Sequence, residues 1–421
     1  MSENLFVKLC SLVLIFLIFT VGSTTIVLAS DPAIRFEKKY DKNYSMDSAS
    51  EVIQADGYFL VGQTQENHDI WLVRTDVSGN ALWNKTYGGS GYESGISLIS
   101  TNDNGLAIVG STDSSGAGGD DGWFIKTDSA GVPQWNETYG GYSDDILVGI
   151  LQESDGGYVL LGNTESLGAG LTDCWLIRTD ENGNELWNKT YGGLNFEASC
   201  AIVHTTDGGY AFGGTTQSFG AGGIDFWLVK LDINGNMQWN KTFGSAQDDV
   251  LGDLILTNDG GFVLAGYYYP NSGETDIRLI KTDNSGNLEW SEIYGESGYA
   301  ETVNSLVELS DGALILAGRN WSYPAHYGSL LKIGSNRVVI WTRTFAGPWD
   351  SDMASIITTD DQGVAAAGYS MGSGYDFWLV KTDSLGMVPE FPSSLVLSIF
   401  LMVTVAAALA SKKKIKRALS S

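Results

Sequence analysis

A tryptophan recurs along this chain at an almost constant interval, and no other feature constrains the fold as strongly. Consecutive tryptophans of this column are 52 or 51 residues apart, and four of them begin the segment W-N-[KE]-T-[YF]-G. Self-similarity at a fixed period of this length indicates a repeat architecture in which each copy packs on its neighbours. The column consists of Trp83, Trp135, Trp187, Trp239, Trp290 and Trp341.

Two further columns repeat with the same period and bring the number of copies to seven. The pattern D-x-W-[LF]-[VI]-[KR] contains Trp71, Trp123, Trp175, Trp227 and Trp378, and Arg278 and Ser329 stand in this column in degenerate copies. Turns of the Asp-Gly type lie at residues 56–57, 103–105, 155–157, 207–209, 259–261, 311–312 and 361–363. Seven copies indicate one continuous repeat domain and not the two or three separate domains that 421 residues would allow.

Each copy contains four short segments with the composition of β-strands. In the third copy they span residues 146–152, 158–163, 174–179 and 185–191. The first two segments are joined by Asp-Gly-Gly and the last two by a turn that ends in Gly-Asn, and both turns suit the positive φ angles of hairpins. Four antiparallel strands in a period of about 50 residues are typical of a β-propeller blade.

The outermost strand of the repeat shows how the ring closes. The W-N-K-T-Y column occurs six times after residue 80, whereas the other columns occur seven times, and residues 36–40 (FEKKY) align with residues 83–87 (WNKTY). We therefore predict an all-β fold, a seven-bladed β-propeller over residues 34–386, in which the N-terminal strand 34–40 completes the last blade beside residues 376–383. This pairing would remove open strand edges, which favour aggregation.

The turn and tryptophan of each copy, as in Asp180, Gly183 and Trp187, resemble the tryptophan-docking repeat of quinoprotein-like propellers. The resemblance implies the fold only. Enzymes of that family need a cofactor pocket with a calcium ligand set and, typically, a pair of adjacent cysteines, and no two cysteines of this chain are adjacent. Because one fold hosts many functions, no activity follows from it.

The N-terminal segment has the features of an export signal. Lys8 precedes an apolar run, and Val27 and Ala29, at the −3 and −1 positions of a cleavage site after Ala29, are β-branched and small as a signal peptidase requires. We predict that residues 1–29 are a secretory signal peptide. The alternative is an uncleaved membrane anchor, because residues 9–29 are long enough to span a bilayer.

The C-terminal segment has the features of a membrane anchor. We predict a short linker over residues 387–394, a transmembrane helix over residues 395–411 and a basic cytoplasmic tail over residues 412–421, which places the repeat domain outside the cell. The sequence Pro389-Glu390-Phe391, followed by this helix and basic stop, resembles the C-terminal signals that archaeosortases process. The resemblance implies an archaeal surface protein and, where such an enzyme acts, cleavage near residues 389–391.

The charge is unevenly distributed and limits the choice of partners. The whole chain carries a formal charge of −26, but residues 31–391 contain 18 basic and 49 acidic residues and so carry −31. Nucleic-acid binding depends on Lys and Arg side chains that neutralise phosphates. The composition therefore argues against a nucleic-acid partner.

Cysteine and histidine, which commonly perform catalysis, are few and scattered in this chain. Cys10 lies in the signal segment, and we expect Cys174 and Cys200 to occupy inward-facing hydrophobic slots as buried free thiols. For Cys200 this expectation rests on its alignment with Ile96, Val148, Gly252, Val303 and Ala354. A disulfide between Cys174 and Cys200 is the alternative for an exported protein. His68, His204 and His326 show no metal-binding or catalytic spacing.

An acidic residue recurs just before each innermost strand. These carboxylates are predicted to circle the mouth of the central channel, where they form a candidate cation site that would suit Ca²⁺. The alternative is that each carboxylate accepts backbone N–H groups at its own inter-blade turn. The seven residues are Asp47, Glu93, Asp145, Glu197, Asp249, Glu301 and Asp352.

Blades five to seven depart from the repeat on the same face of the predicted ring. Aromatic residues replace the Gly-Ala-Gly and Gly-Gly loops of the regular copies, with Arg319 and carboxylates nearby. Large aromatic side chains in exposed loops are typical of a carbohydrate- or protein-binding patch. The alternative is that a diverged blade fills its gaps with locally packed rings. The candidate ligand-binding residues are Tyr267, Tyr268, Tyr269, Trp321, Tyr323, His326 and Trp349.

Six sequons predict glycosylation outside the cell, although four of them lie in the repeated W-N-[KE]-T strand and would also arise from the repeat alone. The asparagines are Asn43, Asn84, Asn136, Asn188, Asn240 and Asn320.

These features together predict an extracellular propeller, held at a membrane through its C-terminal helix, that acts as a non-catalytic binding or adhesion scaffold without a cofactor. Its expected partners, besides the membrane, are a surface glycan or a protein. The alternatives are a propeller-type lyase or glycosidase, which would need catalytic side chains that converge at the channel mouth, and a structural surface-layer component.

Overall fold

The structure is a computed structural model that describes residues 34–42, 46–270, 274–295, 299–322, 325–345, 350–371 and 374–383. The chain divides into two units, and the described residues all belong to the unit Asp31–Leu385. The predicted signal peptide, linker, transmembrane helix and basic tail lie outside the described residues. Within the described ranges, no helix is long and apolar enough to cross a membrane.

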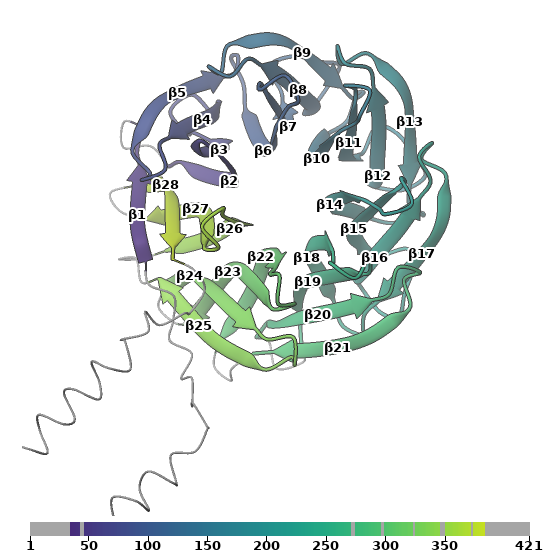
Figure 1. Ribbon diagram of the computed structural model, residues 1–421. Helices are drawn as coiled ribbons and strands as arrows, with labels where there is room; N and C mark the ends of the chain where they lie inside the picture. The colour runs from purple at the N-terminus through teal and green to yellow at the C-terminus, as the bar shows by residue number, and fades with distance from the viewer. Residues whose placement is uncertain are drawn as a thin grey trace, which may run out of the picture. The chain divides into compact units, whose positions relative to one another are not determined.

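Seven four-stranded antiparallel sheets are arranged in a closed ring, which confirms the predicted seven-bladed β-propeller (Figure 1). Blade one comprises β2 (Ser48–Ala55), β3 (Gly57–Gln63), β4 (Ile70–Thr75) and β5 (Ala81–Tyr87), and blade two comprises β6 (Glu93–Ser100), β7 (Leu106–Thr112), β8 (Asp121–Thr127) and β9 (Pro133–Tyr139). Blade three comprises β10 (Asp145–Gln152), β11 (Tyr158–Thr164), β12 (Asp173–Thr179) and β13 (Glu185–Tyr191), and blade four comprises β14 (Glu197–His204), β15 (Tyr210–Thr216), β16 (Asp225–Leu231) and β17 (Met237–Phe243). Blade five comprises β18 (Asp249–Leu256), β19 (Phe262–Tyr268), β20 (Asp276–Thr282) and β21 (Leu288–Tyr294), and blade six comprises β22 (Ala300–Glu308), β23 (Leu314–Ser322), β24 (Ala325–Ile333) and β25 (Val339–Phe345). Blade seven comprises β26 (Ser351–Thr358), β27 (Val364–Met371), β28 (Tyr375–Thr382) and β1 (Ile34–Tyr40).

The N-terminal strand closes the ring as predicted. β1 pairs antiparallel with β28, with Lys39 opposite Trp378. The Trp378 indole N–H donates a hydrogen bond of 2.9 Å to Glu37, and the Tyr40 hydroxyl donates one of 2.7 Å to the Gly79 carbonyl of blade one. The first and last strands of the domain are thereby joined to each other and to the first blade.

The outer strand of each regular blade docks on a turn of the next blade. Gly131 adopts a φ of 71° in such a turn, and a Cβ atom added to it would lie 2.8 Å from the Trp83 ring of the preceding blade. The Tyr87 hydroxyl donates a hydrogen bond of 2.8 Å to the carbonyl oxygen of the same glycine. Glycine is required here because the turn needs a left-handed conformation and the ring leaves no room for a side chain.

The tryptophans of the third strands fill the interfaces between blades. Each of the seven hydrophobic clusters combines residues of two neighbouring blades. Trp123, Trp175 and Trp227 are at most 9% exposed, so their burial contributes strongly to each interface. Their indole N–H groups donate hydrogen bonds of 3.1, 3.3 and 3.2 Å to Asn136, Asn188 and Asn240, the asparagines of the W-N-[KE]-T strand.

A β-bulge interrupts the innermost strand of every blade. In β10, for example, the pairing with β11 shifts between Leu147 and Gly149, so that Val148 has no residue paired with it in β11. A bulge bends its strand and re-aims the extra side chain. The bulge residues are Ser50, Ile96, Val148, Cys200, Gly252, Asn304 and Ala354. The predicted alignment was wrong in blade six, where Asn304 and not Val303 matches Cys200.

Candidate functional site

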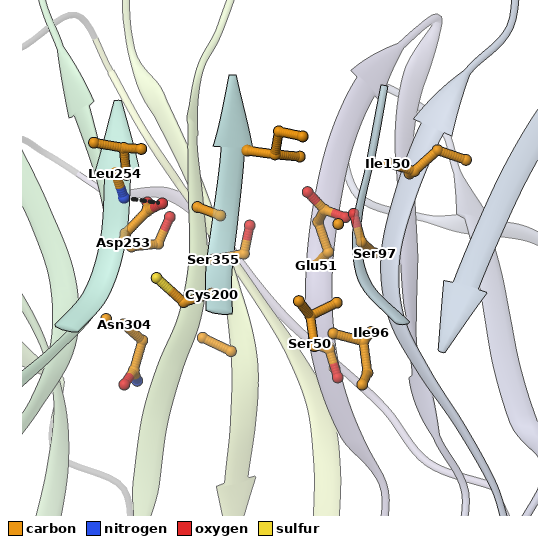
Figure 2. A pocket seen from close by; sticks show the side chains of 18 of the residues that line it. Ser50, Glu51, Ile96, Ser97, Ile150, Cys200, Asp253, Leu254, Asn304 and Ser355 are labelled. Carbon is orange, nitrogen blue, oxygen red and sulfur yellow. Dashed lines mark hydrogen bonds between the residues drawn. The ribbon is translucent and has the colours of Figure 1, made fainter. Parts of the chain in front are cut away.

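The central channel contains a cavity of about 520 Å³, and every blade contributes its bulge residue to the wall (Figure 2). The residue after each bulge also lines the cavity, and it is polar in five blades: Glu51, Ser97, Asp253, Ser305 and Ser355. The corresponding residues of blades three and four are Gly149 and Ala201. The polar side chains are therefore unevenly distributed around the ring.

Glu51 connects blade one to blade two. Its carboxylate accepts a hydrogen bond from the backbone N–H of Leu98, and the Ser97 hydroxyl also bonds to it. Figure 2 shows the Glu51 and Ser97 side chains next to each other in the channel wall. Burial raises the pKa of Glu51 to about 7, because the low-dielectric environment outweighs these hydrogen bonds.

Asp253 connects blade five to blade six in the same way. Its carboxylate accepts hydrogen bonds of 2.9 Å from the Leu306 N–H and 2.7 Å from the Leu254 N–H, and the Ser305 hydroxyl is a third partner. The bond from Leu254 is drawn in Figure 2. Burial raises the pKa of Asp253 to about 6.

Two serines continue this series around the channel. The Ser305 hydroxyl accepts the Ile356 N–H at 3.3 Å, and the Ser355 hydroxyl accepts the Val52 N–H at 3.4 Å. In each of the four links, the residue after one bulge accepts the N–H of the second residue after the bulge in the next blade. Because a buried N–H without a partner is costly, these side chains have a structural role.

Five of the seven acidic residues before the innermost strands are turned into their own inter-blade turns. Asp145 and Glu197 accept the backbone N–H groups of Gly141 and Gly193 at 2.8 and 2.7 Å, and Glu93 and Asp249 make the equivalent bonds. Asp47 accepts the Lys42 N–H at 3.0 Å. This geometry fits the alternative in which each carboxylate accepts backbone N–H groups at its own inter-blade turn. The described residues contain no group of three or more His, Cys, Asp or Glu side chains that could hold a metal ion.

The assignment of Asp352 to this ring was wrong. Ser351 is the first residue of β26, lies three positions before the bulge residue Ala354, and is therefore the equivalent of Asp145. Ser351 is fully buried, and its hydroxyl accepts the Gly328 N–H at 2.9 Å. Asp352 instead accepts a hydrogen bond of 2.8 Å from the amide group of Asn304, a residue of the channel wall.

Aromatic residues of the candidate binding patch cluster in pairs on blades five and six. The rings of Tyr267 and Tyr269 are 5.7 Å apart, and those of Trp321 and His326 are 5.5 Å apart, both in edge-to-face contact. Tyr269 and Trp321 are each 45% exposed. Tyr323 and Trp349, also predicted for this patch, lie outside the described residues.

Contacts continue from this patch across blade seven to the channel. His326 Nδ1 lies 3.0 Å from an Asp350 carboxylate oxygen, and the Tyr375 hydroxyl donates a hydrogen bond of 3.3 Å to the other oxygen. The Tyr375 ring is 5.0 Å from that of Tyr369, which lines the channel cavity. We call the set Tyr267, Tyr269, Trp321, His326, Asp350, Tyr369 and Tyr375 the mouth patch.

Arg319 supplies a positive charge beside the mouth patch. Burial raises the pKa of Asp352 to about 6, and the Arg319 guanidinium opposes this shift. Burial also raises the pKa of Tyr369 to about 12, with the Asp352 and Asp350 charges adding to the effect and Arg319 again opposing it. One guanidinium from blade six thus acts on both a carboxyl group and a phenol of blade seven.

The two cysteines are free, as expected, but their surroundings differ. Cys174 is buried in the interface between blades three and four. The expectation of a buried hydrophobic slot was wrong for Cys200, which is only partly buried and lines the channel cavity, with its thiol 3.4 Å from the Gly213 carbonyl oxygen. The bulge explains the difference, because it turns this side chain away from the sheet.

The sequon asparagines fall into two structural classes. Asn84, Asn136, Asn188 and Asn240 are exposed on outer strands. Asn320 is only partly exposed in β23, where its amide N–H₂ group lies 3.4 Å from Glu301. Asn43 lies outside the described residues.

Comparison with known proteins shows the fold and no family. No family model matches the chain. Regulatory protein FlaEY of Caulobacter vibrioides is 24% identical over 225 residues, a match that covers 47% of this chain and 23% of that protein. The matched segment therefore spans about a quarter of the length of this relative.

Solved structures of similar shape belong to proteins of several kinds. Virginiamycin B lyase from Staphylococcus aureus gives a TM-score of 0.53 at 11% identity and covers 82% of this chain and 99% of its own. Puromycin hydrolase gives 0.53 at 12% identity over 86% of this chain and 58% of its own, and polysaccharide lyase Uly1 gives 0.51 at 10% identity over 79% and 89%. Identities this low show the propeller fold alone.

Proposed function

We propose that the propeller is a non-catalytic binding and adhesion scaffold of the cell surface and that it takes a glycan or protein ligand at the mouth patch. The observation that carries this proposal is the exposure of Tyr269 and Trp321, each 45% exposed although both belong to packed ring pairs. A large aromatic side chain held rigidly by a neighbour loses little conformational freedom when it binds a ligand.

The charges of the mouth patch fit a neutral or cationic ligand. His326 pairs with Asp350 in the patch, Arg319 interacts with Asp352 beside it, and residues 31–391 carry −31. An acidic body repels anions at long range. A neutral saccharide or a basic protein surface therefore suits the patch better than an anionic polysaccharide.

The channel supports binding more than catalysis. Glu51 and Asp253, its two acidic side chains in the cavity wall, are each held by backbone N–H groups of the next blade. A glycosidase needs two carboxyl groups that are free to transfer protons or to attack the sugar. Side chains that already satisfy the backbone are poor candidates for either role.

The proposed location comes from the two ends of the chain. A signal peptide would export the propeller, and the apolar segment 395–411 with its basic tail would hold it at the membrane. The resemblance of residues 389–417 to an archaeosortase signal supports an archaeal cell surface, and the tryptophan-docking turns support a quinoprotein-like repeat. Glycosylation of the exposed outer-strand asparagines would suit this location.

Binding to a glycan array and to extracts of surface proteins would test the proposal. We expect the full chain to bind in at least one of the two formats and the double variant Tyr269→Ala/Trp321→Ala to lose that binding. Leu82→Ala/Leu186→Ala is the control, because both leucines are exposed on outer strands away from blades five to seven. Equal binding by both variants and the unaltered protein would contradict the proposal.

A further inference from the structure

The interface between blades five and six lacks the tryptophan that fills the regular interfaces. Ser329 pairs with Gly318 and with Thr344, the same register that Trp175 has with Gly162 and Thr190. Blade six therefore has a hydroxymethyl group at the position where the regular blades have a buried indole.

The hydrogen-bond partner of the missing indole is also replaced. Asn188 accepts the Trp175 indole N–H at 3.3 Å and follows Trp187 in the sequence. The residue after Trp341 is Thr342, so both members of the tryptophan–asparagine pair are smaller in blade six. Blade five shows another outcome of the same loss. Its column residue, Arg278, forms an ion pair of 2.7 Å with Asp249 of the same blade.

A cavity of about 610 Å³ lies at this interface, and Ser329 and Thr342 form part of its wall. Three tyrosines line the cavity, Tyr294, Tyr299 and Tyr327, together with Glu301 and aliphatic side chains of both blades. Tyr327 stands where Asp173 caps the loop of blade three, since both residues lie two positions before the column residue of their blade. Ligand pockets in proteins have volumes of roughly 300–1,000 Å³, so this cavity is large enough for a small molecule.

The chemistry of the wall indicates the class of ligand. The space lies where an indole ring is absent, and tyrosine faces attract cations as well as planar rings. Glu301 is only 7% exposed and adds a carboxylate to the wall of a domain that carries −31. A buried carboxylate favours a ligand that is cationic or donates a hydrogen bond.

We propose that the cavity between blades five and six is a binding site for a small aromatic amine, a planar ring of about indole size that carries a protonated amino group. The ring takes the place of the missing tryptophan between Ser329 and the tyrosines, and the ammonium group faces Glu301. This site lies in a blade interface, is lined by residues other than those of the mouth patch, and does not depend on the proposed function.

Calorimetry and thermal unfolding of the full chain in detergent would test the proposal, with tryptamine as the probe. We expect tryptamine to bind and to raise Tm with concentration, as any ligand of the folded state does. Indole should bind about tenfold more weakly, because it lacks the charge-assisted hydrogen bond. Indole-3-propionate, which is anionic, should not bind.

Two variants distinguish this site from nonspecific binding. Ser329→Trp/Thr342→Asn restores the regular pair, so it should raise Tm without ligand and abolish the shift with tryptamine. Glu301→Gln should reduce the affinity for tryptamine to about that of indole and leave indole binding unchanged. This second test does not depend on the folding of the double variant Ser329→Trp/Thr342→Asn. Failure of the unaltered protein to bind tryptamine would overturn the proposal, as would equal binding of tryptamine by Glu301→Gln.

Discussion

The hydroxyl group of Tyr191 donates a hydrogen bond of 2.6 Å to the carbonyl oxygen of Gly235, which lies in the next blade. Gly235 has a φ of 72°, and a Cβ atom added to it would lie 2.7 Å from the Trp187 ring. The tyrosine and the tryptophan of one outer strand therefore hold the same glycine. This contact explains why tryptophan, tyrosine and glycine recur together in the sequence.

Gly235→Ala should destabilise the propeller by about 2–4 kcal/mol, because the alanine both adopts a positive φ and collides with the Trp187 ring. Gly208→Ala is the matched control. Gly208 has a φ of 83°, but an added Cβ would meet nothing within 4 Å. Chemical denaturation should therefore give a clearly larger loss for Gly235→Ala, and equal losses would show that the contact with Trp187 adds nothing.

Phe36→Ala should lower Tm, because Phe36 of β1 takes the place of the docking tryptophan and packs against Gly79 of blade one. Lys39→Ala, on the exposed side of the same strand, is the control and should change Tm little. Deletion of residues 31–42 should have a larger effect than Phe36→Ala. An unchanged Tm after the deletion would refute ring closure by β1.

Glu51→Gln should stabilise the protein relative to the unaltered chain as the pH rises. The pKa of Glu51 is raised to about 7, so its contribution to stability is complete below the unfolded pKa of 4.5 and is lost as the pH rises through 7. Glutamine does not titrate and can still accept the Leu98 N–H. The difference in Tm between variant and parent should increase from pH 4.5 to pH 8. The exposed control Glu181→Gln should show no such trend, and a trend of equal size there would contradict the account.

Asp207→Asn should have the opposite pH dependence. Hydrogen bonds from Thr205 and Lys230 lower the pKa of Asp207 to about 2, so this carboxylate stabilises the fold above its unfolded pKa and loses its effect as the pH falls from about 4 to 2. The cost of the variant should be less than about 1 kcal/mol at pH 7, because Asp207 is 53% exposed and screened by solvent. Thermal unfolding should show that the cost vanishes near pH 2, and a constant cost would contradict the assignment.

Peptide mass spectrometry of protein from its native membrane should find a higher glycan occupancy on the outer-strand sequons than on Asn320. Asn136 is exposed in β9, and its acceptor oxygen is the one bonded to Trp123, whereas Asn320 lies inside a blade and partners Glu301. Occupancy of Asn320 with bare outer strands would contradict this ordering.

The sequence was sufficient for the blades and for their closure because both rest on short repeated motifs. Trp187, Tyr191 and Gly235 form a contact between an outer strand and the turn of the next blade, and the same contact recurs in the regular copies. Residues 36–40 repeat this pattern well enough to be recognised without a tryptophan, since Phe36 and Tyr40 keep the ring and the hydroxyl group.

The side chains that line the channel could not be predicted, because a β-bulge leaves no mark in the sequence. One unpaired residue turns Cys200 into the cavity. In blade seven Ser351 occupies the acidic column, so the neighbouring Asp352 lies outside it. The polar residues after the bulges, such as Glu51 and Asp253, differ from blade to blade, so no repeated motif indicated them. The exchange of tryptophan for Ser329 is visible in the sequence, but only the structure shows the cavity that Ser329 and Thr342 line.

We propose that the propeller binds a ligand and does not convert it. The most direct test is to incubate the full chain with the ligand found in the binding screen, and to measure by mass spectrometry both the amount bound and the mass of the ligand recovered. The account predicts that the unaltered protein retains the ligand, that Tyr269→Ala/Trp321→Ala does not, and that the recovered ligand has its original mass. A ligand that is cleaved or modified by the unaltered protein would contradict the account.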